Sequence, residues 1–256
     1  MLVPNMLRLV LLALSVASLG TAQGPLRFEL EHFEKKTKAC VIKLEYPEIT
    51  SAASPQARDR MNAGILRVLL RQSDFPGSDS GFRSLDEYAN GFVKECEGFQ
   101  SRPEARSLYQ YKLVTIFRYT PPIVSFRCDA TEDGGGVHPF GTTFFVNFES
   151  ETGKAVAVTD LLKEGALPKL TSLAEGVFRR YQKLSATESL SEQGYGFTDN
   201  RFRLNDNFGV GERELVFLFN TYEIGAGAMP PTEIKIDHVS LRGLLRPNVH
   251  LEWPYE

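Results

Sequence analysis

The sequence predicts an α+β protein of two closely packed subdomains, each an antiparallel sheet covered by helices. Three observations predict this: short segments of alternating apolar and polar residues recur, brief turn sequences separate them, and no regular strand–helix–strand succession indicates a parallel sheet. Of the 256 residues, 42% are hydrophobic and 24% are charged, which is ordinary for a globular protein. We place a signal peptide at residues 1–22, an N-terminal subdomain at 23–158 and a C-terminal subdomain at 159–256.

The N-terminus has the pattern of a secretory signal. Arg8 precedes an apolar run at residues 9–19, and small residues follow at 20–22 as a cleavage site. The run is too short to span a bilayer, and no other apolar run reaches that length. We therefore expect an exported protein, periplasmic or extracellular, without a membrane span. The formal net charge of −3 disfavours nucleic acid as a partner.

Three cysteines, Cys40, Cys96 and Cys128, occur in a chain that we expect in an oxidising compartment. Their spacing matches no zinc pattern, so one disulfide and one remaining thiol is the simplest prediction. Each cysteine falls on the apolar face of its element, so periodicity does not choose the pair. We favour Cys40–Cys128, because both residues lie on strands of what should be one sheet. The alternative is three buried thiols.

The first half of the chain should hold two helices among several strands. Residues 39–46 alternate and end at Pro47, which predicts a strand. The pair Ser54-Pro55 predicts a helix N-cap followed by proline in the first turn. Ser84 and Glu87 have the spacing of a capping box, which predicts the start of a second helix. Aromatic and β-branched residues predict further strands at 109–119, 123–128 and 142–148.

The second half should combine one long helix with short strands. A helical pattern extends over residues 167–184, and a polar loop follows at 185–200. The remaining elements are strands at 201–204, 214–220 and 232–237, and a final helix at 238–245.

A glycine-rich segment, Gly134 to Pro139 (GGGVHP), is the most distinctive local sequence. Glycine takes positive φ without steric cost, and proline favours an extended conformation at His138. The next strand ends in Ser150 to Lys154 (SETGK), which predicts a tight turn. These residues resemble the extracellular module of RsiV-type anti-sigma factors and of some peptidoglycan deacetylases. That module commonly has a Gly-Gly-Ala-His-Pro segment and then a strand ending in Thr-Gly-Lys; Val137 stands where alanine is usual.

The resemblance extends into the second half. Residues 215–224 (LVFLFNTYEI) are similar to the family's strand that leads into Asn-Pro-Tyr-Glu-Ile, with Thr221 in place of the proline, and residues 225–230 (GAGAMP) resemble the loop that follows. The resemblance implies recognition rather than turnover, since RsiV-type ectodomains bind animal-type lysozyme and fill its substrate cleft with loops. We expect neither sigma-factor signalling nor deacetylation, because no intracellular segment or catalytic domain accompanies the module.

Three classes of function stay open: a non-catalytic envelope module that captures a lysozyme-like muramidase, a module that binds peptidoglycan itself, and an enzyme acting on cell-wall glycan. The last is disfavoured, because the sequence contains no nucleophile motif and no phosphate-binding loop. We expect no cofactor and no metal. The candidate binding residues are Tyr222, Glu223, Met229 and Pro230 in one segment, and Gly135, Gly136 and His138 in the other.

Two of these residues have competing interpretations. His138 could form a hydrogen bond within its turn, contact a partner, or act with Asp129, Glu132 and Asp133 as a metal ligand or acid–base group. The spacing is not that of a His-Glu-x-x-His helix, which argues against the last interpretation. Tyr222 could close the core at the end of a strand, or it could be exposed and add contact area at little entropic cost.

Overall fold

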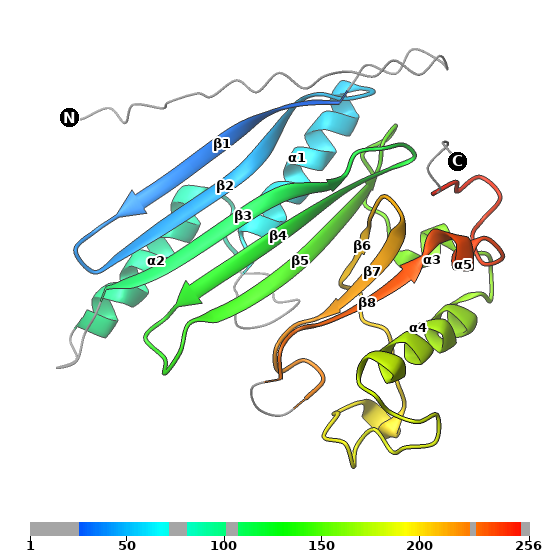
Figure 1. The fold of residues 1–256 in the computed structure, drawn as a ribbon. Helices are drawn as coiled ribbons and strands as arrows, with labels where there is room; N and C mark the ends of the chain where they lie inside the picture. The colour runs from blue at the N-terminus through cyan, green and yellow to red at the C-terminus, as the bar shows by residue number, and fades with distance from the viewer. Residues whose placement is uncertain (1–25, 72–80, 101–106, 226–228, 252–256) are drawn as a thin grey trace. The chain divides into compact units, whose positions relative to one another are not determined.

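The computed structural model describes residues 26–71, 81–100, 107–225 and 229–251. They form a five-stranded sheet, a three-stranded sheet and five α-helices, which confirms the predicted α+β class (Figure 1). The described residues up to 115, with 130–140 and 150–154, form one compact unit; residues 116–129, 141–149 and those from 155 onwards form the other. This division differs from a single boundary at residue 159, because three strands contribute to both units. The predicted signal peptide lies outside the described residues.

The larger sheet has five strands in chain order: β1 (Arg27–Lys36), β2 (Cys40–Ser51), β3 (Leu108–Arg118), β4 (Ile123–Asp133) and β5 (Phe140–Glu149). Strands β1 and β2 pair antiparallel, but β2 and β3 pair parallel, so the larger sheet is mixed where the sequence predicts an antiparallel one. The physical reason is the crossover: α1 (Pro55–Leu69) and α2 (Leu85–Gln100) carry the chain back before β3 begins.

Both crossover helices begin where the sequence predicts. The Ser54 hydroxyl accepts a hydrogen bond from the Ala57 amide at 3.1 Å, so Ser54 is the N-cap of α1. The Ser84 hydroxyl accepts one from the Glu87 amide at 3.2 Å, and the Glu87 carboxylate accepts one from the Arg83 amide at 2.8 Å. These bonds satisfy amides that the first turn of a helix leaves without partners.

The two helices cover one face of the first unit's strands, as Figure 1 shows. Ile42, Leu44 and Ile49 of β2 are at most 1% exposed, as are Met61 and Ile65 of α1. Burying each such side chain contributes about 1.5–3 kcal/mol, so this layer stabilises the unit substantially.

Lys112 of β3 shows which way that strand faces. Its ammonium group is buried and donates to the Leu69 carbonyl oxygen at 2.8 Å and to the Arg71 carbonyl oxygen. A cation here stabilises the last carbonyls of α1. In the first part of β3, Leu108, Gln110 and Lys112 therefore lie on the face covered by the helices, and the residues between them lie on the other face.

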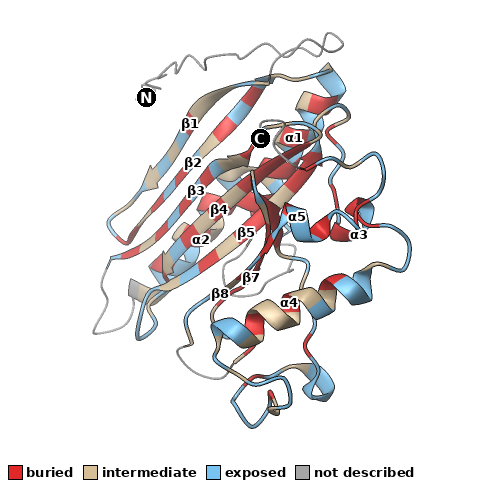
Figure 2. Ribbon diagram, turned by 45° about the vertical axis from the view of Figure 1, so that its right-hand side comes forward, coloured by how far each residue is buried: buried red, intermediate tan, exposed pale blue. Residues whose placement is uncertain are grey.

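The smaller sheet contains β6 (Phe208–Val210), β7 (Glu214–Phe219) and β8 (Thr232–Asp237), all antiparallel. Helix α4 (Leu167–Tyr181) buries Leu170, Ala174 and Phe178 on one side, and Figure 2 shows exposed residues on the other. The Phe178 ring lies 4.9 Å from that of Tyr195, between ring centroids. Two single-turn helices, α3 (Val158–Leu161) and α5 (His238–Leu241), complete the unit, with a 3-10 turn at Thr198–Asn200.

Several sequence-based boundaries were wrong. Strand β2 continues past Pro47 to Ser51, because its pairing with β3 stops at Glu45 and a proline is tolerated where a strand lacks one neighbour. Residues 201–204 are not a strand, and the helix expected at 238–245 ends at Leu241. Strands β1 and β6 were not predicted, since β1 is rich in charge and β6 has only three residues.

The free edge of β5 is bonded by asparagine side chains instead of another strand. The Asn220 carbonyl oxygen Oδ1 accepts from the Thr143 amide at 2.8 Å, and the Asn207 Oδ1 accepts from the Phe145 amide at 3.0 Å. The Asn207 Nδ2 donates back to the Thr143 carbonyl oxygen at 2.8 Å. A side-chain amide has the donor and acceptor of a peptide group, so these residues stand in for a neighbouring strand.

A third asparagine lies inside the second unit. Asn147 Oδ1 accepts from the Ser125 hydroxyl at 2.7 Å and from the Val210 amide at 3.2 Å, while its Nδ2 donates to the Phe208 carbonyl oxygen at 2.8 Å. Asn147 is 3% exposed. It therefore joins β5 to β6 through two hydrogen bonds and to β4 through a third, all shielded from water.

Candidate functional site

The glycine-rich segment connects β4 to β5, and its middle glycine is fixed by packing. Gly135 has φ +87°, and the Asp133 carboxylate accepts a hydrogen bond from its amide at 3.0 Å. A Cβ atom at Gly135 would lie 2.2 Å from Cε2 of the Phe99 ring in α2. Any other residue would meet both a strained backbone and a collision. Gly135 thus lets the segment pack closely against α2.

The Thr-Gly-Lys turn after β5 packs against α1 through a glycine, as the glycine-rich segment packs against α2. Gly153 has φ +64°, and a Cβ atom there would lie 2.3 Å from the Ala57 carbonyl oxygen. Arg60 of α1 donates to the Thr152 carbonyl oxygen at 2.9 Å. The two halves of the sequence motif therefore each provide a glycine against which one crossover helix packs.

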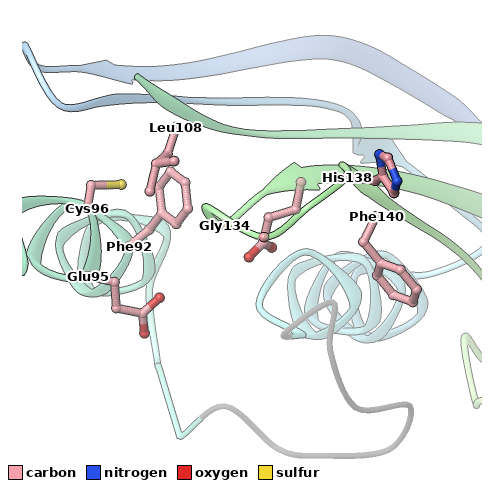
Figure 3. A pocket seen from close by; sticks show the side chains of 9 residues that line it. Phe92, Glu95, Cys96, Leu108, Gly134, His138 and Phe140 are labelled. Carbon is pink, nitrogen blue, oxygen red and sulfur yellow. The ribbon is translucent and has the colours of Figure 1, made fainter. Parts of the chain in front are cut away.

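A pocket of about 330 Å³ opens beside the glycine-rich segment. Figure 3 shows Glu95 of α2 and His138 at opposite ends of it, with His138 and Phe140 pointing to opposite sides of the chain. Carboxylate, imidazole and aromatic groups are present, but in this arrangement Glu95 and His138 do not converge on one reacting atom. The lining residues are Phe92, Glu95, Cys96, Leu108, Glu132, Gly134, Gly136, His138 and Phe140.

His138 is exposed, and among the described residues it has no hydrogen-bond partner within its turn. The turn is held instead by the Asp133 carboxylate, which accepts from the Gly135 amide, and by the packing of Gly135 on Phe99. Two acidic residues near it in sequence already accept hydrogen bonds. The Asp129 carboxylate accepts from the Thr143 hydroxyl at 2.7 Å, and the Glu132 carboxylate accepts from the Gln110 side-chain amide. Within the described residues no group of three His, Cys, Asp or Glu is placed to hold a metal ion.

The second candidate segment begins directly after β7 with a tight turn that presents Tyr222. Tyr222 has φ +68° and is 61% exposed, so it does not close the core. The Glu223 carboxylate fixes the turn: it accepts from the Asn220 amide at 2.8 Å and from the Asn205 Nδ2 at 2.6 Å. Glu223 is therefore engaged within the protein, and Tyr222 is the side chain that the turn offers to solvent.

The base of this segment is also ordered by contacts. Ile224 accepts from the Gly196 amide at 2.8 Å, and Gly225 forms an isolated bridge with Tyr195. A Cβ atom at Gly225 would lie 2.4 Å from the Met229 sulfur, so Met229 packs onto the glycine, while Pro230 is exposed. Among the predicted binding residues of this segment, Tyr222 and Pro230 are accessible, and Met229 and Glu223 support them.

Sequence reasoning missed a surface row on β3, formed by Tyr109, Tyr111 and Leu113. Tyr109 and Tyr111 stack with centroids 4.8 Å apart and planes 18° apart, and Tyr111 and Leu113 are 40% and 41% exposed. Because they alternate with Gln110 and Lys112, which are buried, the row faces away from α1 and α2. The alternation of residues along this strand could have indicated the row, but it was used only to predict a strand, not a binding surface.

The predicted disulfide Cys40–Cys128 is not formed. All three cysteines are buried, and β3 lies between β2, which carries Cys40, and β4, which carries Cys128. Strands two places apart are separated by about 9–10 Å, beyond the span of a disulfide. Cys40 instead lies in the layer between β2 and α2, the helix that carries the buried Cys96.

Residues 159–238 match DUF3298, a family of proteins of unknown function. Two solved structures share the fold. A DUF3298 family member from Bacteroides fragilis has a TM-score of 0.69 at 19% identity, covering 87% of this chain and 94% of that one. A DUF3298 family protein from Pseudomonas aeruginosa has a TM-score of 0.64 at 16% identity, covering 88% and 96%. No curated protein matches. At these identities the likeness establishes the α+β fold of nearly the whole chain.

Proposed function

We propose that this chain is a non-catalytic recognition protein of the bacterial envelope that captures a lysozyme-like muramidase through the Tyr222 turn. The observation that carries the proposal is an exposed aromatic side chain on a rigid support. Tyr222 is 61% exposed, and its turn is closed by the Asn220–Glu223 hydrogen bonds. Tyrosine is enriched at the energetic centres of protein interfaces.

Rigidity matters because binding costs the conformational freedom of each group that it immobilises. The Tyr222 turn follows β7, whose residues Leu215 to Phe219 are all at most 2% exposed. Its backbone is therefore already ordered before a partner arrives, and docking immobilises little more than the tyrosine ring. The resemblance to RsiV-type ectodomains, which fill the lysozyme cleft with loops, supports the choice of partner.

Tyr222→Ala is expected to weaken inhibition of an animal-type lysozyme about thirtyfold, which corresponds to about 2 kcal/mol. The melting temperature should stay within about 2 °C of the wild type, because the lost ring is on the surface. The measurement is the inhibition constant in a cell-wall lysis assay, with unfolding followed by circular dichroism.

Tyr181→Ala is the matched control, since Tyr181 is 65% exposed on α4 and lies outside the turn. It should leave inhibition unchanged. Equal losses from Tyr222→Ala and Tyr181→Ala would contradict a specific role for the turn, and a wild type that inhibits no lysozyme at micromolar concentration would remove the muramidase as the partner.

A second candidate function, binding of the peptidoglycan glycan itself, is favoured by the surface row on β3, in which Leu113 continues the stacked rings of Tyr109 and Tyr111. A sugar ring has an apolar face that packs on aromatic side chains, and an open sheet face leaves room for an extended strand. Lys43 and Glu45 of β2 lie opposite Tyr111 and Leu113 in the register and are exposed, so hydrogen-bonding groups flank the row.

Tyr111→Ala should reduce co-sedimentation with purified peptidoglycan about tenfold if this second function operates, as expected when an aromatic contact of about 1.4 kcal/mol is lost. Tyr119→Ala provides the comparison, because Tyr119 is 63% exposed and follows the end of β3. If neither variant changed the sedimentation, the row on β3 would not be a glycan-binding surface. Loss in the Tyr119 variant alone would have the same consequence.

A further inference from the structure

We propose that Cys40 and Cys96 form the disulfide of the oxidised protein and that Cys128 remains a thiol. Cys40 is the first residue of β2 and is 1% exposed, and Cys96 lies on α2 and is 0% exposed. Helix α2 packs on β2 in the same unit, so both buried side chains lie in the layer between them. The bond would join α2 to the sheet that it covers.

The surrounding geometry supports this pairing independently. Leu108 pairs with Cys40 across the β2–β3 register, and Leu108 and Cys96 line the same end of the pocket. Figure 3 shows the Cys96 sulfur pointing from α2 towards Leu108. Leu108 is the register partner of Cys40, so the sulfur points towards the start of β2. The Thr37 hydroxyl lies 3.8 Å from the Cys40 sulfur and holds the start of β2 in place.

The reaction needs an external oxidant, which we take to be a disulfide: oxidised glutathione or the active-site disulfide of an oxidoreductase. One thiolate of the pair attacks it and forms a mixed disulfide, releasing one thiol. The second cysteine then attacks its partner's sulfur and releases the other thiol. The pair loses two protons and two electrons, and the oxidant is reduced to two thiols.

The burial of the pair determines when this reaction can occur. Burial raises the pKa of the Cys96 thiol, and the hydrogen bond with Cys40 raises it further. Thiolate is therefore scarce in the folded protein, and the reactive form of the cysteine is the thiolate. The bond should form while α2 is still docking, and the folded, reduced protein should react slowly.

The test is refolding of the full chain from denaturant in a buffer of oxidised and reduced glutathione, followed by alkylation under denaturing conditions and peptide mass mapping. The expected result is one alkylated cysteine, Cys128, and one linked peptide pair containing Cys40 and Cys96. Cys128→Ala should give the same linked pair, and Cys96→Ala should give none. A linked pair that contains Cys128, or three alkylated cysteines after oxidative refolding, would overturn the proposal.

Thermal unfolding adds a second readout. Reductant should lower the melting temperature of the oxidised wild type by several degrees, because a disulfide that closes a long loop restricts the unfolded chain. The Cys96→Ala variant should show no shift with reductant, whatever its own stability. An equal shift in the two proteins would mean that the effect does not come from this bond.

Discussion

Replacing Gly153 with alanine is expected to lower the free energy of unfolding by about 2–4 kcal/mol. An alanine at φ +64° costs about 1 kcal/mol, since the left-handed region crowds its Cβ. The new methyl would also lie 2.3 Å from the Ala57 carbonyl oxygen, which belongs to the backbone of α1 and can move only with the helix. Forcing a group into such a contact costs about 1–3 kcal/mol more. Urea unfolding followed by circular dichroism measures the loss.

Gly81→Ala separates the two contributions. Gly81 has φ +73°, but a Cβ atom there would meet nothing within 4 Å. Its substitution should therefore cost only the conformational term, about 1 kcal/mol. If Gly153→Ala and Gly81→Ala cost the same, the turn does not pack on α1 as closely as the distance indicates.

Replacing Asn147 with alanine should cost about 3 kcal/mol. The change leaves the Ser125 hydroxyl, the Val210 amide and the Phe208 carbonyl without the partner that each has inside the second unit. Each buried group deprived of its partner costs about 1–3 kcal/mol, partly offset where it finds another. The melting temperature and the urea midpoint should both fall.

Ser125→Ala removes one bond of the same set and leaves the other two. Its expected cost is about 1 kcal/mol, roughly a third of that for Asn147. A cost for Asn147→Ala no greater than that for Ser125→Ala would show that the two bonds to β6 contribute nothing to stability.

The local elements of this fold were predictable where a short-range chemical reason fixes them. Ser54 and Ser84 start their helices because a side-chain oxygen three residues before an amide can bond it whatever the tertiary fold. The direction of β3 was not predictable in the same way. Whether two strands pair parallel depends on how the helices between them return the chain, and residues far apart in sequence decide that.

The candidate site was predictable only where local sequence decides it, and its geometry depends on tertiary contacts. An exposed Tyr222 was one of two interpretations of its sequence, and the positive φ that turns it outward depends on Glu223 reaching Asn220 and Asn205. The neighbouring thiols of Cys40 and Cys96 could not be chosen from periodicity, because each cysteine lies on the apolar face of its own element. Only the packing of α2 on β2 brings these two together.

The asparagines along β5 also bear on how this protein behaves at high concentration. An uncovered strand edge offers its amides and carbonyls to any other chain, and growth of fibrils begins by such addition. Here the Thr143 and Phe145 amides are already taken by Asn220 and Asn207. A second copy would have to displace these side chains before it could extend the sheet. Two polar side chains thus block the addition of a second copy at this edge.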